Sequence, residues 1–431
     1  MAMLLLAYGC GGRARSDGAA GRSVASAGSG ATSAGSGGEP SEPNSQGGGG
    51  AGGGGGASTR ATKQCPMLHG QLAYGPIGEP QPLPLTVGSF AGCPRCVGAR
   101  DIFGFRTAPG YGFVWRVGFD PNGPGPNLFN WTADPDFKGG EPLPLVAENT
   151  ANDLAVVPAP NGFVAATCSL NSELQWIELN HDLDVAGGSS VVVPDAPCSR
   201  SIFWTGKVYV TAFADSRGLV LASLDEQGAL VEEKILSAGA EEPVVTSFSK
   251  NGDRVLFVFS KNRKRAWYVV LDLRGAPLGA AQPFGEESSF VSSLALVPAG
   301  DGWWVASDGM VTNETGAQLT GISRDGLVWR ERRVLSGFAQ PSGFTPSAYG
   351  GSLLVATMDS GGEYGALFNL TALIDDAGEV VYTESKQLDG FDFDGSIQGV
   401  VIDALRDLVI RPLPLEGSER TIVVQEYGCL D

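Results

Sequence analysis

The chain has 431 residues, a formal net charge of −18 and two histidines. A chain this acidic repels nucleic-acid phosphates, which excludes a nucleic-acid-binding function. The sequence also lacks a P-loop, a dinucleotide-binding glycine fingerprint and a His-rich metal motif, and two histidines give little support to Ser-His-Asp or Cys-His catalysis.

The first ten residues, MAMLLLAYGC, end a short apolar run with a cysteine. The run is too short to span a bilayer. The segment Leu6-Ala7-Tyr8-Gly9-Cys10 resembles the end of a bacterial lipoprotein signal peptide, in which a small residue precedes the acylated cysteine. That pattern has Leu where this chain has Ala7, so we expect the true start of the signal to lie upstream. The resemblance implies lipidation of Cys10; the alternative is a secreted protein without a lipid.

Residues 11–64 contain no aromatic residue and consist mostly of Gly, Ser, Ala, Thr and Pro. Such a segment has too little apolar surface to offset its ordering entropy, and we expect a flexible tether with an end-to-end distance of about 40 Å. A cysteine followed directly by a Gly/Ser-rich tether resembles the surface lipoproteins of Gram-negative bacteria, notably the myxobacterial kind. The resemblance implies an exported protein, anchored by lipid to the outer membrane or cell surface.

Residues 65–431 are the predicted folded part. The tether has five basic and three acidic residues, so the folded part carries a net charge of about −20 against −18 for the whole chain. A sequence pattern recurs along the folded part: an apolar strand is followed by Asp, two further residues, Gly and a second strand. Asp and Gly favour tight hairpin turns. The first two copies are Asp136–Gly139 and Asp184–Gly187, and the glycines of the six copies are residues 139, 187, 228, 275, 326 and 378.

A further hairpin precedes each of these turns, so each unit has four strands, named a to d in chain order. Four-stranded units that recur every 41–52 residues are typical of a β-propeller, whose units are called blades. The tail after residue 396 supplies strands a, b and c of one more blade, and residues 72–87 supply its missing strand d. We therefore predict an all-β fold, a β-propeller of seven four-stranded blades whose ring closure is shared between the N- and C-termini. The six complete units are 101–146, 150–193, 198–236, 244–284, 290–335 and 345–388.

Six cysteines remain besides Cys10, and an even set in an exported chain predicts three disulfides. In the propeller, Cys65 precedes the N-terminal strand d and Cys429 ends the last strand c, so their bridge would latch the ring. Cys168 ends strand b of the second blade and Cys198 begins strand a of the third, so the two are expected on the same face of the ring. The alternative is that both are free thiols. Cys93 and Cys96 are three residues apart and are expected to form the third disulfide. The alternative for this pair is a redox or zinc motif. The predicted bridges are Cys65–Cys429, Cys168–Cys198 and Cys93–Cys96.

Loops that join strand b to strand c, or one blade to the next, form the expected ligand face. Asp389, Asp392 and Asp394 alternate before the last blade and resemble the first half of a calcium loop, which makes Ca²⁺ the candidate cofactor. The alternative is a solvated acidic turn. A basic hairpin tip in the fourth blade is a candidate contact for a carboxylate, a phosphate or a uronic sugar, unless it is an ordinary charged turn. Its residues are Lys261, Arg263, Lys264 and Arg265.

The segment Ser323–Trp329 is similar to the Asp-box of sialidase-type propellers. The resemblance implies structural support at a c–d turn and no sialidase activity. Trp204, Trp303 and Trp304 fall within expected strands, and burial between blades is favoured over a role in stacking sugars.

The sequence thus predicts a monomeric, lipid-anchored binding module of the cell envelope, with an envelope protein or a glycan as its partner. The alternative is a carboxylate-based glycan hydrolase or lyase at the central channel, for which Asp101, Asp153 and Glu242 are the candidate acids. A third hypothesis is that the protein is a purely structural component of the envelope. Whether the protein is an enzyme stays open, and the absence of a catalytic set favours binding.

Overall fold

The structure, a computed structural model, describes most of the chain from residue 64 onward, and its regular elements are all β-strands. These residues belong to one compact unit, Gly50–Asp431. Within them no helix is long and apolar enough to cross a membrane. The described ranges are 64–68, 71–84, 99–117, 128–145, 154–168, 173–186, 191–197, 201–238, 243–261, 265–285, 291, 293–311, 314–336, 338–359, 367–388, 399–414 and 420–430.

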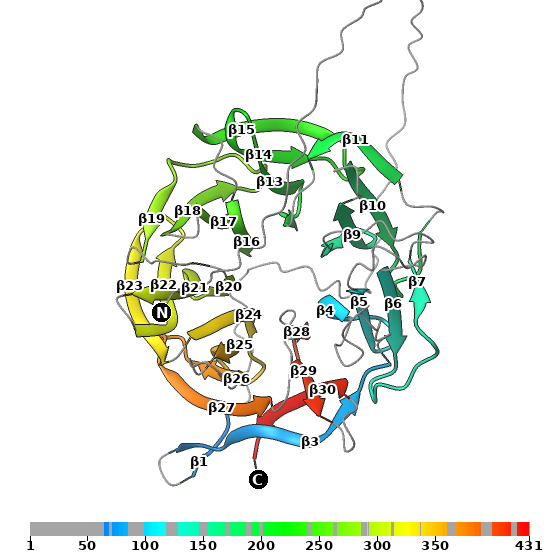
Figure 1. Cartoon of the computed structure of the whole chain (residues 1–431), viewed down its shortest axis with the longest axis vertical. Helices are drawn as coiled ribbons and strands as arrows, with labels where there is room; N and C mark the ends of the chain where they lie inside the picture. The colour runs from blue at the N-terminus through cyan, green and yellow to red at the C-terminus, as the bar shows by residue number, and fades with distance from the viewer. Residues whose placement is uncertain are drawn as a thin grey trace, which may run out of the picture. The chain divides into compact units, whose positions relative to one another are not determined.

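Five separate sheets each contain four antiparallel strands that follow one another in chain order, and Figure 1 shows them side by side around a ring. The first strands β16, β20 and β24 lie near the centre of the ring, and the fourth strand of each sheet lies at its periphery (Figure 1). This is the blade arrangement of a β-propeller. The strands are β8 (Leu154–Ala159), β9 (Gly162–Cys168), β10 (Glu173–Leu179) and β11 (Val191–Pro197); β12 (Ile202–Trp204), β13 (Tyr209–Asp215), β14 (Gly218–Leu224) and β15 (Leu230–Ala238); β16 (Pro243–Asn251), β17 (Arg254–Lys261), β18 (Arg265–Asp272) and β19 (Gln282–Phe284); β20 (Leu294–Ala299), β21 (Gly302–Val311), β22 (Glu314–Ser323) and β23 (Val328–Ser336); and β24 (Phe338–Pro346), β25 (Ser352–Asp359), β26 (Leu367–Ile374) and β27 (Val380–Leu388).

An eight-stranded sheet closes the ring, in the order β3-β30-β29-β28-β4-β5-β6-β7. It divides into two four-stranded halves at β28 and β4, which pair in parallel, with Val401 opposite Gly104. The half that contains both chain ends is called the closing blade, and its outermost strand is the N-terminal β3, as the sequence predicts. The two halves and the five separate sheets are compatible with seven blades. The strands are β3 (Tyr74–Pro82), β30 (Arg420–Cys429), β29 (Asp407–Pro414), β28 (Gly399–Ile402), β4 (Ala99–Arg106), β5 (Tyr111–Val117), β6 (Leu128–Ala133) and β7 (Leu143–Pro144).

A disulfide joins Cys65 to Cys429, the pair expected from the sequence, with the two Cα atoms 5.0 Å apart. Cys65 is buried beside Tyr74 and Tyr427, in the core cluster between the closing blade and β24–β27. The chain then forms a short hairpin of β1 (Met67–Leu68) and β2 (Gln71–Leu72), which the sequence did not lead us to expect, before it enters β3. The bridge therefore fixes the segment that leads into the outermost strand to the end of its neighbour.

The recurring Asp explains why the c–d turns form. In the turn after β14, the Oδ1 atom of Asp225 accepts hydrogen bonds from the backbone N–H of Gln227 at 3.0 Å and of Ala229 at 2.8 Å. Gly228 completes the turn with a φ of 83°, a conformation that glycine adopts at little cost. The same position is taken in the other described c–d turns by Asp134, Asn180, Asp272, Ser323 and Asp375.

The sequence prediction of the first two turns was wrong. The capping residues are Asp134 and Asn180, two and four residues before the Asp136 and Asp184 that the repeat had indicated. Phe137 and Leu183 hold the position that is Gly in the later blades, with φ values of 59° and 66°. Positive φ is unfavourable for such residues. Both side chains are buried, at 9% and 0% exposure, and this burial offsets the backbone strain.

The core consists of separate clusters between neighbouring blades. Trp303 and Trp304 are adjacent on β21 and both are fully buried, but they point to opposite sides because side chains alternate along a strand. Trp303 packs in the cluster shared with β17 and β18, and Trp304 in the cluster shared with β25 and β26. The expected burial of these two residues is confirmed, whereas Trp204 is half-buried.

A substitution in one turn tests the role of the recurring Asp. Asp225→Ala removes the acceptor of two backbone N–H groups, and we expect a loss of about 1–2 kcal/mol in the free energy of unfolding. Urea unfolding of the full chain measures it. Glu226→Ala, at the next and exposed position of the same turn, is the matched control and should change the value by about 0.5 kcal/mol or less. Equal losses in the two variants would contradict the capping role.

Candidate functional site

A pocket of about 360 Å³ lies between the closing blade and the blade of β4–β7. The turns that join strand a to b and strand c to d meet on one face of a propeller, and this pocket opens among such turns. It is therefore on the face opposite to the one where the sequence placed the ligand loops. Its lining comes from β3, from the c–d turn after β6, from the a–b turn before β29, and from β30. The residues are Ile77, Gly78, Glu79, Gln81, Pro135, Asp136, Phe137, Lys138, Arg406, Val424 and Glu426.

At three other c–d turns a large ring of the preceding blade, Trp176, Tyr268 or Trp304, contacts the turn glycine. The glycine of a c–d turn packs on the preceding blade, so that a Cβ added to Gly228 would lie 3.2 Å from the ring of Trp176. In the same way the Tyr268 hydroxyl donates a hydrogen bond to the carbonyl of Gly326 at 2.7 Å. At the closure these places are held by smaller or charged side chains of β30, Val424 and Glu426. The large rings that contact three other c–d turns have no counterpart among the residues of β30 that line the pocket.

A bulge in β3 widens the same space. Its pairing with β30 shifts between Ile77 and Gln81, and Gly78 has a φ of 65°. The buried side chain of Gln425 holds this bulge by donating to the carbonyl of Ile77 at 3.1 Å and to that of Gly78 at 3.3 Å. Arg411 in turn donates to Oε1 of Gln425 at 3.1 Å. Bulges of this kind are common beside functional sites because they move a stretch of strand away from its neighbour.

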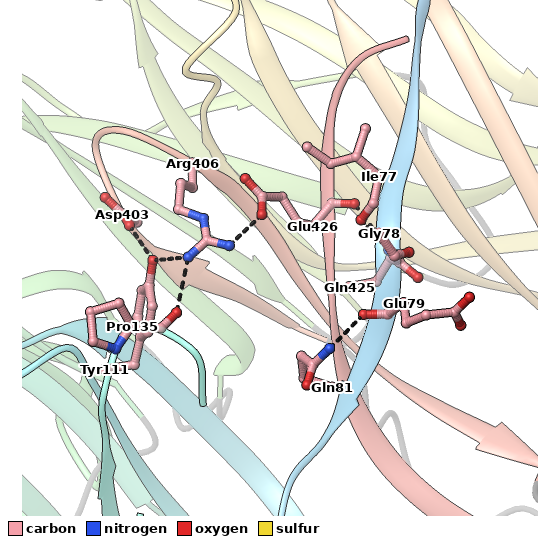
Figure 2. Close-up of polar contacts among 10 residues, drawn as sticks. All are labelled: Ile77, Gly78, Glu79, Gln81, Tyr111, Pro135, Asp403, Arg406, Gln425 and Glu426. Atoms are coloured by element: carbon pink, nitrogen blue, oxygen red, sulfur yellow. Dashed lines mark hydrogen bonds and ion pairs between the residues drawn. The ribbon is translucent and has the colours of Figure 1, made fainter. Parts of the chain in front are cut away.

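Arg406 links the elements around the pocket, as Figure 2 shows. Its guanidinium donates to the hydroxyl of Tyr111 at 3.1 Å, to the carbonyl of Pro135 at 3.3 Å, and to the carboxylate of Glu426. The Tyr111 hydroxyl donates at 2.9 Å to Asp403, which is 6% exposed. These bonds tie the a–b turn of the closing blade to the neighbouring blade and fix the pocket floor.

The electrostatics of this floor keep its groups in defined protonation states. The hydrogen bond to Glu426 raises the pKa of Arg406, so the guanidinium stays charged. Burial, together with the hydrogen bond to Asp403, raises the pKa of the Tyr111 hydroxyl, which therefore remains a donor at neutral pH. The ring of Phe137 stacks on Tyr111 with centroids 4.6 Å apart, which accounts for its place in a turn where glycine is more usual.

Most of the site residues predicted from the sequence lie outside the described residues. These are Cys10, Cys93, Cys96, Cys198, Arg263, Lys264, Asp389, Asp392 and Asp394, and for Cys168 and Lys261 only the backbone is described. Arg265, at the start of β18, lies opposite Lys261 and is half-buried. The side chains of the channel candidates Asp101, Asp153 and Glu242 also lie outside the described part. Among described residues no group of three or more His, Cys, Asp or Glu side chains could hold a metal ion.

Sequence reasoning missed Arg406, Glu426 and Phe137. One signal was available: once the turns are aligned on their capping residue, Phe137 appears where later blades have Gly. Leu183 holds the same position in the next blade, so this signal marks the first two blades and does not single out the pocket. The bulge of β3 left no comparable trace in the sequence.

Comparison with known proteins shows the fold and nothing finer. No protein-family model and no curated relative matches the chain. The WD40 domain of Toxoplasma gondii coronin has a TM-score of 0.50 and 13% identity, over 86% of this chain and 89% of that domain. The WD40 domain of SCAP from fission yeast has a TM-score of 0.41, with 9% identity over 79% of this chain and 82% of that one. BBS1N in complex with ARL6DN has a TM-score of 0.44, with 10% identity over 82% of this chain and 97% of that one. At these identities the likeness to the coronin domain shows a β-propeller.

Proposed function

We propose that this protein is an exported, lipid-anchored β-propeller that binds a ligand at the cell envelope, and that the pocket beside the closing blade is a binding site. The observation that carries the proposal is the pocket itself, which lies beside a c–d turn of the kind that a large ring contacts at three other blades. Its volume is at the lower end of the range of ligand sites, about 300–1,000 Å³. Its lining contains no Ser, Cys or His, so it offers no nucleophile–histidine pair and supports binding rather than acyl transfer.

The position of the tether is consistent with this proposal. Cys65 is bonded to Cys429 at the end of strand c of the closing blade, so the chain from residue 64 enters the ring on the face that carries the pocket. A lipid on Cys10 and a tether of the dimensions expected from the sequence of residues 11–64 would therefore place the pocket face about 40 Å from the membrane. Such a site would take soluble envelope ligands or exposed parts of neighbouring envelope proteins.

Thermal unfolding of the full chain tests the binding role. Cationic, anionic and neutral probes are added singly: agmatine, inorganic phosphate and N-acetylglucosamine. A ligand at about a hundred times its Kd adds about 2.7 kcal/mol to the free energy of unfolding, which raises Tm by a few degrees for a domain of this size. We expect at least one probe to raise Tm in this way.

Two tryptophan variants decide whether the pocket is responsible. Lys138→Trp places a large ring at the pocket rim, at an exposed turn position. Ala229→Trp is the matched control, because it changes the same position of the c–d turn in another blade. The Tm shift should disappear in the first variant and persist in the second. No shift with any probe, or a shift that survives Lys138→Trp, overturns the proposed site.

A further inference from the structure

We propose that the pocket beside the closing blade recognises a primary ammonium or guanidinium group, as carried by a lysine or arginine side chain or by a free organic amine. This inference rests on the proposed function and names the chemical class of its ligand. It is argued from the polar groups that the pocket leaves unpaired, from the charges that already neutralise one another, and from the charge of the whole folded part.

The groups that the pocket leaves unpaired are mainly acceptors. Arg406 makes one contact to Glu426, through Oε2, so that Oε1 of Glu426 has no partner among the described residues. Gln81 donates through Nε2 to the carbonyl of Glu79, and its Oε1 also has no partner among the described residues. The carboxylates of Glu79 and Asp136 have no hydrogen-bond or ion-pair partner within the described part of the chain. A ligand that supplies several N–H donors fits this set.

The cations of the pocket are fewer and one is already paired. Arg406 is bonded to Glu426, to the Tyr111 hydroxyl and to the Pro135 carbonyl, so an anionic ligand would have to displace these bonds. Lys138 is the other cation in the lining, and its ammonium is exposed in the turn. Three carboxylates against two cations give the lining a formal charge of −1.

The negative net charge of the chain also favours a cationic ligand. The whole chain carries −18, and clefts on a strongly acidic body concentrate cations and repel phosphates and carboxylates. The apolar part of the lining, Ile77, Phe137 and Val424, can contact the methylene stem of a lysine or the chain of an alkyl amine. Unpaired acceptors beside an apolar part of the lining thus match a long side chain that ends in a cation.

Ligand-observed NMR on the full chain tests this inference. The probes are N-acetyl-lysine methylamide, agmatine, the neutral isostere N-acetyl-norleucine methylamide, inorganic phosphate and N-acetylglucosamine. We expect the two cationic probes to bind and their affinity to fall as salt screens the charges. Tighter binding of the lysine amide than of agmatine identifies a protein side chain as the natural source, and the reverse order identifies a free amine.

Charge variants give a signature that a general loss of structure would not. Asp136→Asn removes a carboxylate and should weaken cation binding about two- to five-fold, whereas Lys138→Gln removes a repelling charge and should strengthen it by a similar factor. Glu226→Gln, on the c–d turn of another blade, is the control and should leave the affinity unchanged.

The outcomes separate the two proposals. Pocket-dependent binding of phosphate or of N-acetylglucosamine, without binding of the cations, overturns the cationic ligand and leaves the binding function standing. Equal binding of the lysine and norleucine amides, or variant effects of one sign only, also overturns it. Failure of every probe to bind overturns both.

Discussion

Replacing both Cys65 and Cys429 with Ala should lower the free energy of unfolding more than any other pair of substitutions considered for this molecule. The bridge spans a sequence separation of 364 residues. In the chain-entropy account a loop of this length is worth about 6 kcal/mol, because the cross-link restricts the unfolded chain. The loss should therefore be about 6 kcal/mol, with β3 as the first strand to detach from β30.

Urea unfolding of the double variant, followed by tryptophan fluorescence, measures this loss. The double variant is preferred to chemical reduction, since reduction would also reach the other cysteines. The matched control is Met67→Ala, which changes an exposed residue in the hairpin that follows Cys65 and should alter the midpoint little. An unchanged urea midpoint in the cysteine variant would show that strand pairing alone holds the ring closed.

The ring closure was predictable because its signals are local and redundant. The tail supplies three strands and the N-terminus a fourth, and a cysteine stands at each end of the pair that must meet. The repeat was predictable for the same reason, since an Asp cap and a Gly at positive φ recur at nearly fixed spacing. In the first two blades the Gly position holds Phe137 and Leu183, so the local signal was lost and the turns were misplaced.

The pocket was not predictable because it depends on contacts between distant segments. Arg406, Glu426 and Pro135 come together only when the ring has closed. The bulge at Gly78 is held by Gln425, which is more than 300 residues away along the chain. Period and composition report which residues form strands, whereas they carry no information on which inter-blade space is left unfilled.

Asp407 is the buried carboxylate that binds three segments of the closure together. It is 1% exposed and lies at the start of β29. It accepts hydrogen bonds from the Tyr74 hydroxyl at 2.6 Å, from Ser347 Oγ at 2.5 Å and from the backbone N–H of Ala348 at 2.7 Å. Tyr74 belongs to β3, and the other two belong to the a–b turn of the neighbouring blade. The carboxylate thus joins the N-terminal strand, the closing blade and the blade beside it.

Asp407→Ala should be strongly destabilising, by about 3–5 kcal/mol, because it leaves two buried donors and one half-buried donor without an acceptor. Asp407→Asn keeps one carbonyl oxygen and the same shape, so its loss should be smaller. Thermal and urea unfolding of the full chain measure both. If Asp407→Ala were no worse than an exposed control such as Asp376→Ala, the carboxylate would not be holding the segments together.

The same carboxylate should make the closure depend on pH. Burial raises the pKa of Asp407 above its ordinary 3.8, although the hydrogen bonds from Ser347, Tyr74 and Ala348 act in the opposite direction. Between the ordinary and the raised pKa, the folded chain holds a proton that the unfolded chain has released. Raising the pH through this window therefore lowers the free energy of unfolding, and the loss is complete above the raised pKa.

Asp407→Asn isolates this contribution, because an amide does not titrate. The difference in unfolding free energy between the natural chain and the variant should be largest below pH 3.8 and should shrink as the pH rises above it. Both proteins share every other titrating group, so the comparison removes the general acid denaturation of a chain with 47 acidic residues. A difference that instead grew with pH would mean that the three hydrogen bonds outweigh desolvation, and that Asp407 stabilises the closure in its charged form.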